Sequence, residues 1–317
     1  MSLTRRAVII TSLAFAASPA VARTGFETWL KKFRRKATRL GFSERTLEAS
    51  LKGAEFLPKV VANDSRQAEV AKPLQDYLAS AASGARLSGG QKALKKYKNT
   101  LSKIERTYGV EKEVLTAIWG MESAYGGFRG NLPVFSTLST LAFEGRRREL
   151  FEAELIAALQ IVEAGHATPA EMRGSFAGAM GHTQFMPSTY QRHAQDFDGT
   201  GHANIWGDDP TDALASTAQL LKAEGWRKGQ PWAVEVMLPR EFDLALTGRI
   251  FPRKTRDWQR LGVTTASSAK LADHGNGALI LPAGPEGPVF MVYNNFHVIK
   301  KYNYADSYAI GVGHLSD

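Results

Sequence analysis

The sequence predicts a mainly α protein of the α+β kind, in which a small β-rich insertion interrupts a helical core. Apolar residues recur at helical spacing over long stretches; in 148–164, for example, Phe151, Leu155 and Leu159 share one face. From 232 to 293 the pattern changes to short apolar runs separated by Pro and Gly, which is typical of strands joined by turns. With 317 residues, 44% of them hydrophobic and 22% charged, the chain has the composition of a globular protein with a sizeable core.

The order of these patterns divides the chain into five segments. A leader precedes an N-terminal helical region and a helical core, and within the core Leu87-Ser-Gly-Gly90 is typical of a loop. The insertion follows, and a short segment rich in tyrosine then completes the core. The expected borders are 1–22 for a signal peptide, 23–76 for the N-terminal helical region, 77–226 for the core, 227–293 for the insertion and 294–317 for the final segment.

The first residues predict export from the cytoplasm. Arg5 and Arg6 precede a mainly apolar run at 7–17, and Ala20-Val-Ala22 provides a small-residue cleavage site before Arg23. The run is too short to span a membrane as a helix. We therefore expect a periplasmic protein without a membrane span once the signal is removed, and both the general and the twin-arginine export routes stay open.

The charge balance favours an anionic partner. The chain has 40 Lys and Arg against 31 Asp and Glu, a net charge of +9; removing residues 1–22 takes away two Arg and no acid, which leaves +7. A basic surface suits an anionic polymer, but no zinc-ligand spacing or RNA-binding motif indicates nucleic acid. The chain has no Cys, so it forms no disulfide and offers no Cys for lipid attachment. We expect a monomer.

One acidic residue stands near the end of an apolar helical stretch. Leu115, Ile118 and Glu122 fall on one helix face, and Gly126 and Gly127 end the helix. A carboxylate on such a face loses hydration, which raises its pKa. A carboxylic acid that keeps its proton near neutral pH can act as a general acid. The alternative is a glutamate at a helix end that turns back to solvent.

A second informative stretch is Gly178-Ala-Met-Gly-His-Thr-Gln-Phe-Met-Pro-Ser188. Gly178 and Gly181 allow a close approach of backbone to a ligand or to other backbone. Gln184 offers both a donor and an acceptor to sugar hydroxyl or amide groups. Taken alone, the stretch also fits a Gly-rich helix junction whose glutamine points to water.

Together, Glu122-Ser-Ala-Tyr-Gly126 and Gly178–Ser188 resemble the membrane-bound lytic transglycosylase B family of peptidoglycan lytic transglycosylases. The resemblance runs from about Phe26 to Leu315. It implies a lysozyme-like helical catalytic core with a small β insertion. It also implies a lyase that cleaves the MurNAc-β-1,4-GlcNAc bond of peptidoglycan strands, forms 1,6-anhydro-MurNAc and requires no cofactor.

The resemblance implies that Glu122 is the single catalytic residue, first as general acid and then as base for the C6 hydroxyl of the sugar. Glycosidases usually use two carboxylates, and no second acid of this sequence stands in a comparable apolar setting. Intramolecular attack by the C6 hydroxyl avoids the entropy of capturing water. A hydrolytic muramidase and a non-catalytic peptidoglycan-binding protein are the alternatives; the presence of Glu122 and Gln184 argues against the second.

The resemblance also assigns residues that bind the substrate. Tyrosine rings suit sugar faces, and arginine suits the carboxylates of peptide stems. Each tyrosine can instead be a half-buried core aromatic, and the arginine pair can be a solvated helix start. The assigned residues are Ser123, Gln184, Tyr302, Asn303, Tyr308, Tyr77, Arg146 and Arg147.

The segment from Asp196 to Asn204 reads like the first nine positions of a calcium-binding EF-hand loop, with Asp at positions 1 and 3 and Gly at position 6. Thr at position 5 removes one charged ligand, which lowers the expected affinity. The ion, where it binds, is expected to be structural, and a polar turn without an ion is the alternative. The candidate ligands are Asp196, Asp198, Thr200, His202 and Asp212.

Overall fold

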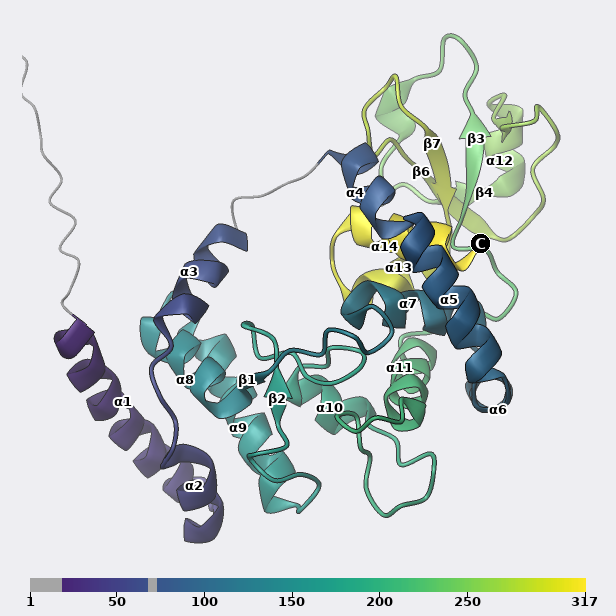
Figure 1. Ribbon diagram of the computed structural model, residues 1–317. Helices are drawn as coiled ribbons and strands as arrows, with labels where there is room; N and C mark the ends of the chain where they lie inside the picture. The colour runs from purple at the N-terminus through teal and green to yellow at the C-terminus, as the bar shows by residue number, and fades with distance from the viewer. Residues whose placement is uncertain (1–18, 68–72) are drawn as a thin grey trace, which may run out of the picture.

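The computed structural model describes residues 19–67 and 73–317, which are mainly helical with a small antiparallel sheet (Figure 1). The expected fold class, mainly α with a small β-rich insertion, is confirmed. The helices are α1 (Pro19–Arg39), α2 (Glu44–Leu51), α3 (Pro58–Gln67), α4 (Leu74–Ala81), α5 (Gly84–Lys96), α6 (Lys98–Tyr108), α7 (Lys112–Ser123), α8 (Val134–Glu144), α9 (Arg148–Glu163), α10 (Pro187–His193), α11 (Thr211–Ala223), α12 (Thr255–Arg260), α13 (Asn294–Tyr302) and α14 (Asp306–Ser316). The strands are β1 (Leu132–Pro133), β2 (Arg173–Gly174), β3 (Ala233–Met237), β4 (Arg253–Lys254), β5 (Thr264–Thr265), β6 (Asn276–Ile280) and β7 (Val289–Val292).

The first three helices and two later ones form one lobe of the molecule. α1 and α2 pack against α8 and α9, and α3 packs against α8 (Figure 1). Phe26 of α1 meets the ring of Phe143 edge to face, with 5.6 Å between the ring centroids. Ser43 caps α2, because its side chain accepts a hydrogen bond from the backbone N–H of Thr46. The N-terminal helices therefore depend on α8 and α9 for the burial of their apolar faces.

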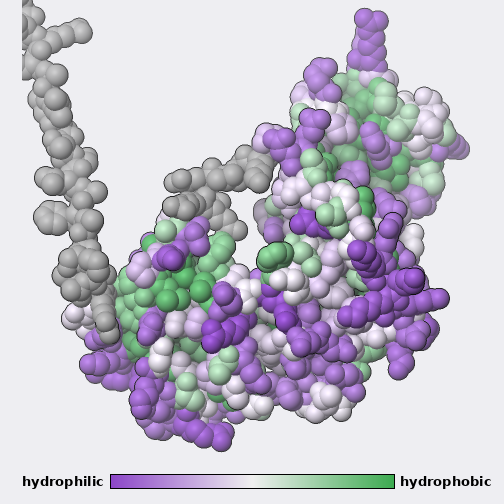
Figure 2. Space-filling view, in the orientation of Figure 1, coloured by the Kyte–Doolittle hydropathy of each residue, from purple (hydrophilic) through white to green (hydrophobic). Residues whose placement is uncertain are grey.

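Helix α7 is the central element of the second lobe. Leu115, Ile118 and Trp119 are buried, as the helical spacing of apolar residues predicts. α5, α6, α11 and α14 pack against α7, and α4 packs against α14. In the space-filling view the surface is hollowed between this lobe and the lobe of α1–α3 (Figure 2). The end of α7 is thus fixed by helices from three separate parts of the sequence.

The sheet lies at one end of the second lobe, and its strand order is β4-β6-β7-β3-β5 (Figure 1). Neighbouring strands are antiparallel, with Ala233 of β3 opposite Val292 of β7. Val236 and Trp258 belong to a small core of the insertion, whereas Phe290 belongs to the main core. Because the sheet contributes to both cores and β7 leads directly into α13, the insertion is tied to the helices that follow it.

The prediction of a loop at Leu87-Ser-Gly-Gly90 is wrong, because this stretch lies inside α5. Its glycines are required by packing against the ring of Tyr125. A Cβ added at Gly89 would stand 2.5 Å from that ring, and one added at Gly120 of α7 would stand 2.5 Å from its hydroxyl oxygen. The hydroxyl donates a hydrogen bond of 2.7 Å to the carbonyl of Arg86. Tertiary packing here outweighs the low helix propensity of glycine.

One expected border of the chain falls within a helix. The border between residues 76 and 77 lies inside α4; it and the other expected borders stay predictions. The predicted signal peptide lies mostly in 1–18, outside the described residues. Within the residues that the structure describes, no helix is both long and apolar enough to cross a membrane.

Candidate active site

Glu122 lies in the last turn of α7, and its side chain is half-buried. The helix ends abruptly, because Ala124, Tyr125 and Gly126 all have left-handed backbone conformations, with φ of 48°, 60° and 86°. Two successive non-glycine residues in this region are strained. The packed ring of Tyr125 and a 2.9 Å hydrogen bond from the N–H of Phe128 to the carbonyl of Ser123 hold the turn. The backbone therefore leaves the helix axis one residue after the acid.

The carboxyl group of Glu122 is surrounded by protein more than by water. Burial raises its pKa to about 7. The hydroxyl of Tyr308 donates a hydrogen bond of 2.5 Å to Oε1, which favours the charged form and opposes the effect of burial. Glu122 therefore exists in both protonation states near neutral pH. This is the property required of one group that first donates and then accepts a proton.

All three predicted tyrosines lie around Glu122. The rings of Tyr302 and Tyr308 are parallel, with an interplanar angle of 6° and 6.4 Å between centroids. The hydroxyl of Tyr302 donates to the carbonyl of Thr183, which lies in the Gly-rich stretch. Tyr77 lies half-buried on α4, where burial and then the charge of Glu122 raise its pKa. The structure thus brings residues of α4, α7, α13 and α14 together.

Ser123 does not contact the carboxylate beside it in the sequence. The side chain is buried, and its Oγ donates a hydrogen bond of 2.5 Å to the carbonyl of His182. The same oxygen accepts a hydrogen bond of 3.0 Å from the N–H of Gly126. Ser123 therefore joins the turn after α7 to the Gly-rich stretch. This position supports the site and leaves no surface for a substrate.

Gln184 is held by its side-chain amide. Its Nε2 donates to the carbonyls of Arg129, at 3.0 Å, and Gly181, at 2.9 Å. The backbone of Gln184 is left-handed, with φ of 54°. The glycine at 181 is necessary, because a Cβ there would stand 2.3 Å from the carbonyl oxygen of Ile205. The amide of Gln184 thus fixes the Gly-rich stretch against the loop that follows Glu122.

Sequence reasoning missed the part played by His182 and Arg129. Nδ1 of His182 accepts a hydrogen bond of 3.2 Å from the indole N–H of Trp119, so Nε2 carries the proton that it donates to the carbonyl of Gly207 at 2.8 Å. Burial lowers the pKa of His182, which favours this neutral form. Arg129 donates to the carbonyl of Trp206 at 2.9 Å. These bonds fix the loop at 204–208. The sequence shows that Arg129 follows Glu122, but it does not show that Arg129 and His182 bind this loop.

The remaining predicted residues lie in other surroundings. Asn303 is exposed at the end of α13, and its Oδ1 accepts a hydrogen bond of 3.2 Å from the N–H of Ala305. Arg146 and Arg147 both bind Asp64, whose side chain is only 4% exposed. A buried carboxylate with two cationic partners joins α3 to the turn between α8 and α9. The side chains of Arg146 and Arg147 stay 41% and 49% exposed at the start of α9 while they bind Asp64, and their role towards peptide stems stays a prediction.

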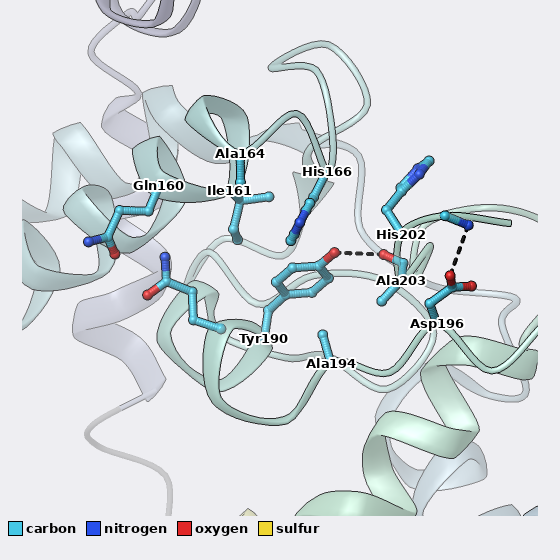
Figure 3. Close-up of a pocket in the computed structure, with 11 residues that line it drawn as sticks. Gln160, Ile161, Ala164, His166, Tyr190, Ala194, Asp196, His202 and Ala203 are labelled. Atoms are coloured by element: carbon cyan, nitrogen blue, oxygen red, sulfur yellow. Dashed lines mark hydrogen bonds between the residues drawn. The ribbon is translucent and has the colours of Figure 1, made fainter. Parts of the chain in front are cut away.

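The Asp-rich loop brings three of its five candidate ligands together. Carboxylate oxygens of Asp196, Asp198 and Asp212 lie within 4.8 Å of one another. Asp196 accepts hydrogen bonds from backbone N–H groups of the loop, including that of Thr200 at 2.9 Å. His202 does not join them; its side chain lies on the wall of a neighbouring hollow and points away from Asp196 (Figure 3).

This hollow has a volume of about 630 Å³ and lies between the end of α9, α10 and the Asp-rich loop (Figure 3). Tyr190 forms part of its wall, and the tyrosine hydroxyl donates a hydrogen bond of 2.7 Å to the carbonyl of Ala203. Glu122 and the tyrosines around it are not among the lining residues. The hollow is therefore separate from the candidate active site.

The raised pKa of Glu122 makes the free energy of unfolding depend on pH. The folded protein holds the Glu122 proton up to pH of about 7, whereas the unfolded chain releases it near its ordinary value of 4.5. Stability contributed by this proton is complete below pH 4.5 and is lost as the pH rises through 7. We expect Glu122→Gln to raise the free energy of unfolding by ~1–3 kcal/mol at pH 8 and to leave it unchanged at pH 4.

Urea unfolding at the two pH values measures this difference. The matched control is Glu286→Gln in an exposed turn of the insertion, which should change stability little at either pH. If Glu122→Gln gave the same difference at pH 4 and pH 8, Glu122 would not hold a proton in the folded protein.

Comparison with known proteins identifies relatives of the chain. The family model described as transglycosylase SLT domain matches residues 25–317. Membrane-bound lytic murein transglycosylase B of Escherichia coli K12 is 35% identical over 221 residues, which are 69% of this chain and 60% of that protein. The chain thus matches less than two thirds of the length of this curated relative.

Solved structures extend the similarity to the fold. SltB3 of Pseudomonas aeruginosa, in complexes with NAG-NAM-pentapeptide and with NAG-anhNAM-pentapeptide, is 43% identical, with a TM-score of 0.89 over 92% of this chain and 78% of that one. The lytic transglycosylase Slt35 of Escherichia coli, in complex with calcium, is 30% identical, with a TM-score of 0.77 over 93% of this chain and 92% of that one. These similarities confirm the lysozyme-like fold and the family expected from the paired motifs. The chain belongs to the transglycosylase SLT domain family.

Proposed function

We propose that this chain is a lytic transglycosylase that cleaves the MurNAc-β-1,4-GlcNAc bond of peptidoglycan and leaves a 1,6-anhydro ring on MurNAc. The observation that carries the proposal is Glu122, whose pKa of about 7 results from burial opposed by the hydrogen bond from Tyr308. Among the described residues no second carboxylate contributes to this pKa, so the proton chemistry falls to one group. Membership of the family and the two sugar-peptide complexes of SltB3 support the same substrate class.

In the first step, Glu122 donates its proton to the glycosidic oxygen, and the bond from this oxygen to the anomeric carbon of MurNAc breaks. The electron pair of that bond stays on the oxygen, which leaves as a hydroxyl group of GlcNAc. The N-acetyl group of MurNAc stabilises the positive charge that develops at the anomeric carbon. Glu122 is now charged, and the hydrogen bond from Tyr308 stabilises it.

In the second step, the C6 hydroxyl oxygen of MurNAc attacks the anomeric carbon and Glu122 takes the hydroxyl proton. The acid is restored, the ring closes and no water is consumed. Because the nucleophile belongs to the same sugar, its attack is intramolecular. A pKa near 7 suits both steps, since a much stronger acid would be a poor base and a much weaker acid would not protonate the leaving oxygen.

The residues around Glu122 are proposed to hold the sugar in place. Tyr77 and Tyr302 flank the carboxylate with half-buried rings, and Asn303, which follows Tyr302 in the sequence, is exposed. Gln184 lies on the Gly-rich stretch, to which the hydroxyl of Tyr302 is also bonded through Thr183. We assign supporting roles to the remaining predicted residues: Ser123 is buried, and Arg146 and Arg147 bind Asp64.

Digestion of purified sacculi followed by mass spectrometry tests the reaction. We expect muropeptides that end in 1,6-anhydro-MurNAc, each lighter by one water than the reducing product of hydrolysis. Glu122→Gln should lower their release by ~10²–10⁴-fold, and release by the wild-type protein should fall as the pH rises above 7, because the first step needs the protonated form.

Three results would separate the alternatives. Reducing ends in place of anhydro ends would identify a hydrolytic muramidase. Binding of sacculi without any release would identify a binding protein. Unchanged release by Glu122→Gln would exclude the acid role of Glu122. The matched control is Glu144→Gln, which removes an exposed carboxylate at the end of α8 and should keep full activity.

The periplasm is the compartment that we propose for this reaction. The charged start, apolar run and small-residue site within residues 1–22 have the pattern of an export signal. The mature protein recovered from a periplasmic fraction should begin at Arg23. The proposal would be contradicted if the protein were found in the cytoplasmic fraction with residues 1–22 still attached.

We also propose that the Asp-rich loop holds a calcium ion with a structural role. Asp196, Asp198 and Asp212 present a compact set of carboxylate oxygens, which are the ligands that Ca²⁺ prefers. Three such groups repel one another unless a cation neutralises them. The complex of Slt35 with calcium supports the proposal. His202 is left out of the ligand set, and Thr200 contributes its backbone N–H to the shape of the loop.

Thermal unfolding with Ca²⁺ or with a chelator tests this proposal. Ca²⁺ at 100 times its Kd should add about 2.7 kcal/mol to the free energy of unfolding, and a chelator should remove this gain. Thr200→Asp should increase the affinity by adding a charged ligand, and Asp198→Asn should decrease it. Mg²⁺ serves as the control cation. Identical melting temperatures with Ca²⁺ and with chelator would rule the site out.

A further inference from the structure

The short turn between α13 and α14 is held by two cations on one carboxylate. Nζ of Lys300, on α13, donates to Oδ1 of Asp306 and, at 2.5 Å, to the carbonyl of Tyr304. Nη1 of Arg249 donates to the same Oδ1 of Asp306 at 2.9 Å. Arg249 belongs to the insertion, 57 residues away from Asp306 in the sequence. One carboxylate therefore joins three segments: the end of α13, the start of α14 and the insertion.

Lys300 is the buried member of this network, whereas the side chains of Arg249 and Asp306 are each about one third exposed. The side chain of Lys300 is only 7% exposed, and a buried ammonium group without partners is strongly unfavourable. The ring of Tyr304 covers Nζ at 4.4 Å from the ring centroid, which adds a cation–π contact. Arg249 is fixed from the other side, because the neighbouring N–H of Gly248 donates a hydrogen bond of 2.7 Å to the carbonyl of Leu279 in β6. The geometry of the turn is therefore determined by several bonds at once.

The two tyrosines that stack beside the acid flank this turn. Tyr302 is the last residue of α13, and Tyr308 lies in the first turn of α14. Only residues 303–305 connect the two helices. A change in the angle between the helices would move the hydroxyl of Tyr308 relative to Glu122, and hydrogen bonds weaken steeply with such displacement. The Lys300–Asp306 pair thus bridges the turn between these two tyrosines.

We propose that Lys300, Asp306 and Arg249 are positioning residues of the active site, which hold the α13–α14 turn so that Tyr308 donates its hydrogen bond to Glu122. Through Arg249 the β insertion also helps to hold the α13–α14 turn. The inference rests on the proposed role of Glu122 as acid and base. None of the three side chains acts on the substrate itself.

The titration of Glu122 is a suitable readout, because few groups contribute to it. Among the described residues, the titratable side chains that face Glu122 are Tyr77 of α4, Tyr302 of α13 and Tyr308 of α14, and burial raises the pKa of each. His297 also lies near the network; burial, Arg249 and Lys300 lower its pKa, whereas Asp306 raises it. A change at Asp306 that reaches Glu122 is therefore expected to do so through Tyr308.

The test compares variants of the network with direct removal of the hydroxyl. Asp306→Asn and Lys300→Met break the turn contacts, Arg249→Gln breaks the contact with the insertion, and Tyr308→Phe is the reference. The pKa of Glu122 is measured by ¹³C NMR of its carboxyl group in the full-length mature protein, and kcat is measured on sacculi. Circular dichroism and thermal unfolding confirm that each variant is folded.

Loss of a donor to the charged form raises the pKa of a carboxylate. We expect Tyr308→Phe to raise the pKa of Glu122 by about one unit above its wild-type value. Asp306→Asn and Lys300→Met should shift it in the same direction, with a fall in kcat of about tenfold. Arg249→Gln should have a smaller effect, because Lys300 still holds Asp306, and Arg249→Lys should restore the wild-type titration.

The matched control is Asp257→Asn, which removes a partly exposed carboxylate of the insertion that pairs with Arg260 at 3.2 Å. It should change neither the titration of Glu122 nor kcat. Folded Asp306→Asn and Arg249→Gln variants with a wild-type titration of Glu122 would overturn the inference, even if Lys300→Met failed to fold. Failure of the proposed function has a different signature, namely undiminished digestion of sacculi by Glu122→Gln.

Discussion

The carboxyl group of Glu122, removed from water at the end of α7 and bonded to the hydroxyl of Tyr308, is the interaction on which the rest of the structure depends. Burial and the hydrogen bond act in opposite directions on its pKa, and their balance gives a value of about 7. Stronger burial without a donor would keep the group protonated, whereas several donors would keep it charged. A group that gives and takes a proton needs both influences, and they come from elements far apart in the sequence.

The elements that hold this balance are tied together mainly by backbone acceptors. Ser123 and Tyr302 donate to the carbonyls of His182 and Thr183, two successive residues of the Gly-rich stretch. Gln184, the next residue, donates back to the loop that follows Glu122. Because each bond connects a different element to the same short stretch, the acid, the tyrosines and the Gly-rich stretch form one unit. The glycines of the stretch are needed for this closeness, since a Cβ at Gly181 would collide with the backbone of Ile205.

Two further carboxylates join elements that lie outside this unit. In the first lobe, the buried carboxylate of Asp64 binds Arg146 and Arg147 and fastens α3 to the turn between α8 and α9. At the opposite end, the insertion reaches Asp306 through Arg249. Both contacts place a carboxylate between two cations, a geometry in which removal of one partner leaves the carboxylate paired with the other.

The sequence alone determined the features that depend on local pattern. Apolar spacing placed Glu122 on a buried helix face, the change of texture after residue 232 indicated the insertion, and the paired motifs identified the family. The tertiary structure decided which side chains meet. The hydroxyl of Tyr308 donates a hydrogen bond to Glu122, 186 positions away in the sequence. Ser123 is bonded to His182 and not to the acid beside it. Gly89 and Gly90, whose sequence pattern is typical of a loop, lie within α5, where they leave room for the ring of Tyr125. Periodicity reports whether a residue is buried, but partners distant in sequence are fixed only by how the helices pack, and that packing sets the pKa of Glu122.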